Sequence, residues 1–206
     1  MLCKLDIEKA YDHVNWEFLM FLLQHCGFSK KWRRWIRCCI STIKFSILIN
    51  GYPSDFFGSS RRLRQGDHLS PFLFDIVMEA LSRMLVAATA AGQFSGFTVG
   101  NEAGSLISVS HLLFADDTLV FCDADSTHIT ALRGILSRFE EMSRLRINLG
   151  KSELIPVGDV PNFHELVEIL GSRESALPLK YLGLPLGASF KISLFGILYW
   201  RRWSEG

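Results

Sequence analysis

The chain has 206 residues, of which 49% are hydrophobic and 21% are charged, so it can form one globular domain with a substantial core. The net charge of +1 excludes nucleic-acid binding through a global basic field, so any such binding must come from local patches. We expect no signal peptide, no membrane-spanning segment and no internal repeat. The cysteines are odd in number and lack zinc-type spacing, which predicts free thiols packed in the core of a protein from a reducing compartment. They are Cys3, Cys26, Cys38, Cys39 and Cys122.

The first elements are a short strand and a helix. Cys3–Ile7 is predicted as a strand that carries Asp6. Asn15 can cap a helix that runs through Gln24, and Gly27 would end it. The apolar residues of this helix recur at helical spacing, namely Trp16, Leu19, Met20 and Leu23.

A second, strongly basic helix follows at Lys30–Ser41. Its apolar residues lie on one face and its basic residues mostly on the other, which is typical of an amphipathic helix. The basic face is a candidate contact for a phosphate backbone, and tryptophans can stack on bases. Because such regular apolar spacing usually marks the core, we interpret Trp32 and Trp35 as packing residues.

Lys44–Ile49 and Tyr52–Phe57 are predicted as the strands of a hairpin, because Asn50-Gly51 is a strong turn signal. A basic stretch then leads to Gln65-Gly66, where the absence of a side chain allows close approach to the backbone. A charge run of this kind is usually a solvated loop. A long helix from Pro71 to about Ala91 follows, with Phe72, Ile76, Met78, Leu81 and Leu85 as core candidates.

Gly96–Val109 is predicted as a glycine-broken strand and turn that leads to His111–Cys122, HLLFADDTLVFC. This stretch predicts a tight hairpin with Asp116 and Asp117 at its tip. Aspartate is common in turns, so a plain hairpin is one interpretation. Two adjacent carboxylates on so apolar a hairpin repel each other unless cations neutralise them, which favours a divalent metal, most plausibly Mg²⁺.

The remaining chain predicts a helix capped by Ser126 or Thr127, with core residues at three- and four-residue steps. These are Ile129, Leu132, Ile135, Leu136, Phe139 and Met142. The segment 145–155 contains Lys151 in a polar loop, and 157–178 is predicted as a loop with a short helix over 162–170. A hairpin at 177–187 ends this pattern.

Together these elements predict an α+β fold in which an antiparallel, βαββαβ-like sheet is backed by helices. Asp6 on the first strand would supply the third carboxylate beside Asp116 and Asp117. One aspartate on a first strand and an Asp-Asp hairpin about a hundred residues later is the layout of a polymerase palm, where two metal ions clamp a phosphoryl transfer.

Five blocks of this sequence, in order, resemble the reverse transcriptase domain of LINE-type (non-LTR) retrotransposons. The residues in these blocks are similar to those of the plant branch. They are LDIEKAYD, RQGDHLSPFLF, FADD, INLGKS and YLGLPLG, and they span Leu5 to Gly187. FADD alone is a weak signal, whereas five ordered blocks with sensible spacing are specific.

The resemblance implies an RNA-directed DNA polymerase that acts on an RNA template, a DNA primer and deoxynucleoside triphosphates, inside the cell and by family in the nucleus. It implies that Asp6, Asp116 and Asp117 are catalytic and, with Ile7, bind two Mg²⁺ ions. Lys151 matches the general acid near the pyrophosphate, although a lone lysine usually faces solvent. Tyr11 matches a steric gate against the ribose 2′-hydroxyl, although from the residues alone it is equally a core residue.

The resemblance also implies further substrate contacts. Arg64, Gln65, Gly66 and Asp67 match the block that supports the nascent base pair and the template. Tyr181 and Gly183 lie in a primer-grip-like hairpin, whose plainer interpretation is an ordinary edge hairpin. By this comparison 1–189 is a palm with partial fingers at 40–69, and 190–206 is an off-pattern tail.

We expect a truncated copy with fingers and thumb largely missing, and three departures from the family pattern are those of an unselected, drifting copy. Arg62 and Arg144 stand where the family usually has glycine, and His68 where it has proline. We hypothesise a frameshift between about Phe190 and Trp200, which the DNA sequence tests directly. The alternative functions are a catalytically inactive remnant with at most weak nucleic-acid binding, for which Arg61–Arg64 is the candidate surface, and a relative of intron maturases. We expect the isolated fragment to be inactive, although its ancestry is that of a polymerase.

Overall fold

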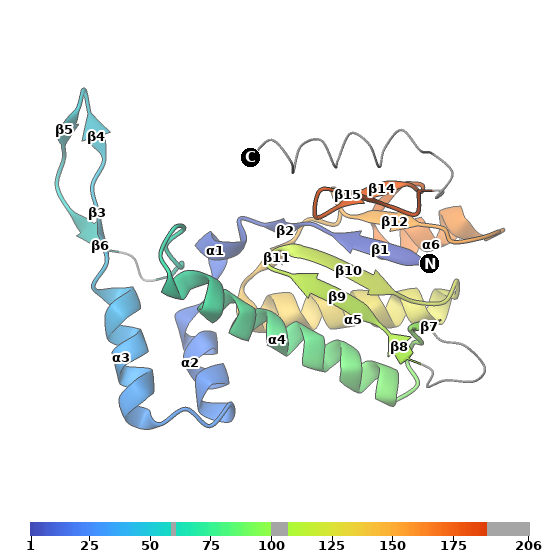
Figure 1. Cartoon of the computed structure of the whole chain (residues 1–206), viewed down its shortest axis with the longest axis horizontal. Helices are drawn as coiled ribbons and strands as arrows, with labels where there is room; N and C mark the ends of the chain where they lie inside the picture. Colours follow the sequence, from blue (N-terminus) through green and yellow to red (C-terminus); the bar gives the residue numbers. More distant parts are fainter. Residues whose placement is uncertain (59–60, 100–106, 189–206) are drawn as a thin grey trace, which may run out of the picture.

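The computed structural model describes residues 1–58, 61–99 and 107–188 and is built around a five-stranded sheet in the order β13-β12-β1-β10-β9 (Figure 1). The strands are β1 (Leu2–Leu5), β9 (His111–Phe114), β10 (Asp117–Phe121), β12 (Glu153–Ile155) and β13 (Arg173–Glu174). Every neighbouring pair is antiparallel except β12 and β13, which are parallel. The mixed α and β composition is as predicted, but the sheet is not purely antiparallel.

Side chains on this sheet alternate between two packed faces, as the two-residue period of a strand requires. Cys3, Leu5 and Val120 belong to the main core on the side of the helices. Leu2, Leu119 and Ile155 pack on the opposite face under a hairpin of β14 (Leu179–Tyr181) and β15 (Leu184–Leu186). Figure 1 shows this hairpin and the long helices on opposite sides of the sheet. The sheet is therefore the middle of three layers.

The helical layer consists of α4 (Leu69–Ala90), α5 (Ser126–Ser143) and α6 (Phe163–Leu170). The faces of α4 and α5 that point to the sheet are apolar at helical spacing, and this burial holds the layer in place. Three details differ from prediction. Phe72 and Met142 are exposed (47% and 44%), and the cap of α5 is Asp125, whose carboxylate accepts from the backbone N–H groups of Thr127 and His128.

A helical hairpin precedes α4. It follows the one-turn α1 (Ala10–His13) and contains α2 (Trp16–His25) and α3 (Lys30–Ser41). Asn15 caps α2 as predicted, because its side chain accepts from Glu17 N–H at 2.9 Å. Ile36 and Ile40 of α3 are buried, but Trp32 and Trp35 are 38% and 52% exposed. The prediction that both tryptophans pack in the core is therefore wrong, because only the face of α3 that meets α2 is covered.

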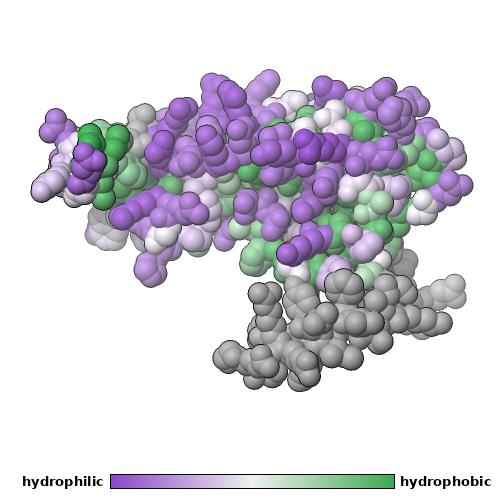
Figure 2. All heavy atoms as spheres, turned by 90° about the horizontal axis from the view of Figure 1, so that it is seen from above, coloured by the Kyte–Doolittle hydropathy of each residue, from purple (hydrophilic) through white to green (hydrophobic). Residues whose placement is uncertain are grey.

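Beyond α3 the chain forms a two-stranded arm that projects from the molecule (Figure 1). The arm pairs β3 (Lys44–Phe45) with β6 (Phe57–Gly58), and β4 (Leu48–Ile49) with β5 (Tyr52–Pro53). Asn50 and Gly51 both have positive φ (51° and 85°), which confirms the predicted tight turn. Figure 2 shows hydrophobic side chains gathered on this arm at one end of a mainly hydrophilic face.

Two short pairs complete the described structure. β7 (Phe97–Val99) pairs with β8 (Ile107–Val109), and β2 (Ile7–Glu8) pairs with β11 (Arg146–Ile147). Cys3 and Cys122 are buried, whereas Cys26, Cys38 and Cys39 are exposed, so the core prediction holds for two of the five cysteines. The predicted off-pattern tail, 190–206, lies outside the described residues. Among the helices of the described part, none is long and apolar enough to cross a membrane.

Candidate active site

Asp6 and Asp117 lie side by side because of the register of the two central strands. Leu5 of β1 stands opposite Thr118 of β10, so the next position toward this edge is Asp6 on one strand and Asp117 on the other. Alternation places both on the face that also carries Leu2 and Leu119. Residues more than a hundred positions apart in sequence thus become neighbours at one end of the sheet.

The third aspartate lies in the turn of the hairpin. β9 ends at Phe114 and β10 begins at Asp117, so the two-residue turn is Ala115-Asp116, with Ala115 at a φ of 52°. The predicted placement of both aspartates at the tip is corrected by one position, since Asp117 already pairs with Phe114. Asp6 and Asp116 are exposed and Asp117 is half-buried. Burial of the carboxylates is therefore not the reason why a cation would bind at this hairpin.

The chemistry of the donors fits a hard divalent cation, although the side chains do not form a closed cage. Across the described ranges, no group of three or more His, Cys, Asp or Glu side chains is gathered closely enough to hold a metal ion. Asn148 N–H donates to the Asp6 carbonyl at 2.8 Å, which makes Ile7 and Ile147 a non-hydrogen-bonded pair. The Ile7 carbonyl therefore accepts no hydrogen bond in the pairing of β2 with β11. Its oxygen is a candidate metal ligand next to Asp6.

The INLGKS loop is fastened to Asp6. The Asp6 N–H donates to Ser152 Oγ at 3.1 Å, and Ser152 Oγ donates to the Asn148 carbonyl at 2.9 Å. Ser152 is fully buried, whereas Lys151 beside it is exposed. The loop thus holds the backbone of Asp6 through a buried hydroxyl and brings the exposed Lys151 to the same end of the sheet.

Tyr11 lies between α4 and the turn that carries Asp116. Its ring stacks on Phe74 with centroids 4.9 Å apart, and it lines a cavity of about 380 Å³ together with Asp75, Phe114 and Ala115. Partial burial raises the pKa of Tyr11, and the nearby carboxylates of Asp75 and Asp116 raise it further. The phenol therefore stays protonated and uncharged at neutral pH.

The basic block RRLRQGD is joined to Tyr11 through the main chain. Leu63 N–H donates to the Tyr11 carbonyl at 2.7 Å, and the buried Leu63 side chain anchors the loop. Arg64 and Gln65 are exposed, and Gly66 has a φ of 86° with no atom near the position of a Cβ. Glycine is therefore needed here for its backbone conformation, and no part of the described chain approaches it closely.

The hairpin β14–β15 packs on the face of the sheet that carries Asp6 and Asp117, opposite the helices. Burial raises the pKa of Tyr181, and the negative charge of Asp117 raises it further, so the phenol lies near that carboxylate. Lys4 Nζ donates to the Lys180 carbonyl at 3.1 Å, which ties the hairpin to β1. Leu182 and Gly183 have φ values of 48° and 82° and form its tight turn.

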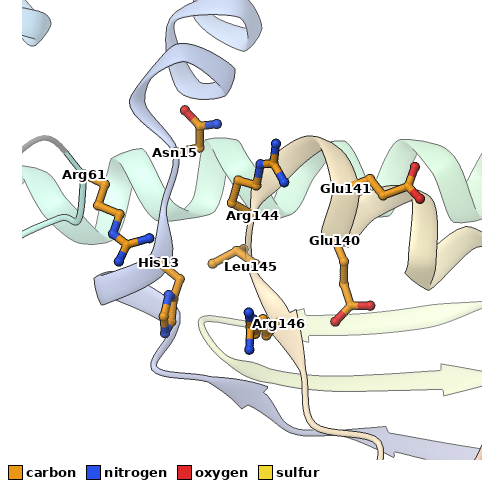
Figure 3. A pocket seen from close by; sticks show the side chains of 8 residues that line it. All are labelled: His13, Asn15, Arg61, Glu140, Glu141, Arg144, Leu145 and Arg146. Atoms are coloured by element: carbon orange, nitrogen blue, oxygen red, sulfur yellow. The ribbon is translucent and has the colours of Figure 1, made fainter.

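A second, larger cleft of about 840 Å³ contains none of the residues predicted for the polymerase site, although Arg61 of the candidate nucleic-acid surface lines it (Figure 3). It lies between the α1–α2 junction, the end of α5 and β11. In Figure 3 Arg61 and His13 approach it from one side and Arg144 from another, and Glu141 points away. Within the cleft Glu140 is engaged, because its Oε1 accepts from Ile147 N–H at 2.7 Å.

Sequence reasoning missed two residues next to the aspartates. Asp75 lies on α4 beside Tyr11, and its only signal is a charge within a largely apolar helix. Ser152 Oγ accepts the hydrogen bond from the Asp6 N–H, and its only signal in the sequence is its place directly after Lys151 in the polar segment that leads to β12. Both depend on contacts between segments far apart in sequence.

Comparisons with known proteins show the family to which the chain belongs. The model of the family "Reverse transcriptase (RNA-dependent DNA polymerase)" matches residues 1–186. The chain therefore belongs to the reverse transcriptase family.

Among curated relatives, an R2 retrotransposon Pol polyprotein of Popillia japonica is 30% identical over 154 residues, which is 74% of this chain and 20% of that protein. An R2 polyprotein of Nasonia vitripennis is 29% identical over 66% of this chain and 12% of its own length. An uncharacterized mitochondrial protein of Arabidopsis thaliana is 45% identical over 34% of this chain and 56% of its own length. The chain thus spans a fifth or less of these R2 proteins and about half of the mitochondrial one.

Among solved structures, telomerase from Candida albicans in complex with a fragment of telomeric RNA has a TM-score of 0.55. It is 16% identical and covers 73% of this chain and 27% of its own. This similarity supports the shared fold.

Proposed function

We propose that this chain is the catalytic palm of an RNA-directed DNA polymerase from a non-LTR retrotransposon of the plant LINE type. The observation that carries the proposal is the adjacent placement of Asp6 and Asp117 on one face of the sheet, with Asp116 in the turn beside Tyr11. An RNA template and a DNA primer would meet a deoxynucleoside triphosphate at this end of the sheet.

Asp6, Asp116 and Asp117, with the Ile7 carbonyl, would hold two Mg²⁺ ions, because carboxylate and carbonyl oxygens are the donors that this cation prefers. Bound there, Mg²⁺ would activate the primer 3′-hydroxyl and neutralise the charge of the triphosphate. The bond between Ser152 and the Asp6 N–H supports this role, since it keeps the Asp6 backbone from shifting when charge builds up at the site.

The cavity beside Tyr11 supports an assignment to the incoming nucleotide. Its wall combines an uncharged phenol, the apolar Met78 and Leu113, and the hairpin turn, and it also carries the carboxylates of Asp75 and Glu79. Stacking on Phe74 holds the ring in place, and we expect an extra ribose hydroxyl to collide with it. We therefore assign Tyr11 as the steric gate.

We assign the other predicted contacts to the same end of the sheet. Lys151, exposed on a loop fastened to Asp6, would donate a proton to the leaving pyrophosphate. Arg64, Gln65 and Gly66 would face the template and the nascent pair, and Tyr181 and Gly183 the primer. The proximity of Tyr181 to Asp117 supports the last assignment.

The decisive experiment is primer extension on an RNA template with Mg²⁺. Asp117→Ala should abolish extension, because it removes one carboxylate of the pair on the central strands. Asp159→Ala is the matched control, since Asp159 is an exposed acid in a distant loop and its loss should change nothing. Extension by Asp117→Ala at the unmodified rate would refute the assignment of the site.

The alternative function is an inactive retrotransposon remnant with weak nucleic-acid affinity. It is favoured by Arg62 and Arg144, which occupy positive φ values of 88° and 63° that cost a non-glycine residue conformational energy. Nucleic-acid binding by the unmodified chain without any extension would support this alternative.

A further inference from the structure

The outer face of α3 carries a stripe of Lys31, Arg34, Trp35 and Cys38, spaced at three- and four-residue steps. Ile36 and Ile40 point to the opposite side and are buried against α2. Trp35 is 52% exposed, and Lys31 Nζ lies 5.0 Å from the centroid of its ring. A large aromatic face thus stands in solvent with a cation over it.

The charges of α3 are sorted between its two sides. The helix contains five basic residues and no acidic one. Two of these basic side chains point toward α2, where Arg37 pairs with Glu17 at 2.7 Å and Arg33 donates to Gln24 at 2.6 Å. Within the described residues no carboxylate forms an ion pair with Lys31 or Arg34. The outward stripe is therefore a local positive patch on a chain whose net charge is only +1.

The arm that follows α3 also carries exposed aromatic rings. Tyr52, Phe56 and Phe57 are 78%, 69% and 47% exposed. Figure 1 shows α3 and the arm in line at one edge of the molecule, with α2 between α3 and the remaining helices. The combination of cations and exposed rings is the composition of a surface that stacks bases while it neutralises phosphates.

We propose that Lys31, Arg34 and Trp35 form a binding site for single-stranded nucleic acid, separate from the aspartates, in which a base stacks on Trp35 and the two cations contact flanking phosphates. Stacking on an indole does not depend on base identity, so the site is indifferent to sequence. The proposal rests on the stripe alone and does not require the chain to polymerise DNA.

The experiment measures binding of a labelled oligothymidylate to the full chain, by fluorescence anisotropy and by quenching of tryptophan emission, with a chelator present and no nucleotide. Because metal and nucleotide are absent, the outcome is independent of the proposed polymerase activity. Trp35→Ala should weaken binding about tenfold, as expected for the loss of one stacked base. Trp35→Phe keeps a ring at this position and should restore most of the affinity.

Phe21→Ala is the matched aromatic control, because Phe21 is 54% exposed on the neighbouring α2 and lies outside the stripe. It should bind as the unmodified chain does. Lys31→Ala should lower the slope of log affinity against log salt by about 0.7, the value for one phosphate contact on a single strand. Arg138→Ala on α5 should leave that slope unchanged.

Equal binding by the unmodified chain and Trp35→Ala would overturn the proposal. An equal loss of affinity in Trp35→Ala and Phe21→Ala would also overturn it, because any exposed aromatic ring would then contribute to binding. Binding to phosphatidylserine vesicles that is stronger than binding to the oligonucleotide and lost in Trp35→Ala would also overturn it, by assigning the stripe to a lipid surface. Circular dichroism of each variant distinguishes lost binding from lost folding.

Discussion

The sheet and the arm use the same kinds of side chain with opposite outcomes. Leu119 and Ile155 in the sheet are fully buried between the helices and the β14–β15 hairpin. Ile49 and Tyr52 in the arm are 61% and 78% exposed, because two strands alone have no layer to pack on. An apolar strand pattern therefore predicts a strand, and only the presence of a second layer decides whether it stabilises the fold or offers a surface.

The largest expected effect tests this contrast directly. Phe74→Ala should destabilise the chain by about 3 to 5 kcal/mol, because Phe74 is fully buried and its loss leaves a cavity beside Tyr11. Ile49→Ala in the arm should change stability by less than about 0.5 kcal/mol. Urea unfolding of both variants measures the difference. Similar losses would mean that the arm is buried against another part of the protein.

A smaller effect concerns the link between core and site. Ser152→Ala should cost about 1 to 3 kcal/mol, because it leaves the Asp6 N–H without its partner. Ser143→Ala is the matched control, since Ser143 is also buried and its Oγ bonds the Phe139 carbonyl and Leu145 N–H. Both should lose stability, but only Ser152→Ala should slow primer extension beyond what its folded fraction explains. Equal rates per folded molecule would limit Ser152 to a structural role.

Relief of backbone strain should stabilise the chain by about 1 kcal/mol. Arg144 ends α5 with a φ of 63°, a conformation that glycine adopts without a clash, so Arg144→Gly should raise the urea midpoint. Arg146→Gly, two residues on in β11, should lower it, because glycine weakens a strand. A drop in both variants would show that the Arg144 side chain contributes more than its backbone costs.

The smallest effect is a pH dependence at the edge strand β9. His111 is bonded to Ser82 and Ser110, and burial lowers its pKa, partly opposed by Glu79. Because the folded pKa lies below the unfolded value near 6.5, this contribution is fully present above about pH 6.5 and is lost as the pH falls through the folded pKa. His111→Gln should reduce the fall in the urea midpoint between about pH 7 and about pH 5. An unchanged fall would assign it to other groups.

Local features of the structure were predictable from the sequence. The Asn15 cap, the Asn50-Gly51 turn and the amphipathic α4 and α5 depend on residues within a few positions of one another. Several of the failures share one cause. The apolar periodicity of α3 correctly grouped Trp35 with the other apolar residues of the helix. Periodicity does not predict how many of those residues the neighbouring helix covers. Phe72 and Met142 are exposed for the same reason.

By itself, the sequence determined which residues are candidates for chemistry, because an aspartate after a strand and an Asp-Asp hairpin are local signals. The tertiary structure decided that they meet, through the register that sets Leu5 opposite Thr118. It also decided that Ser152 holds Asp6 and that Asp75 lies beside Tyr11. Strand register and burial are set by contacts between distant segments, and local propensities carry no information about those contacts.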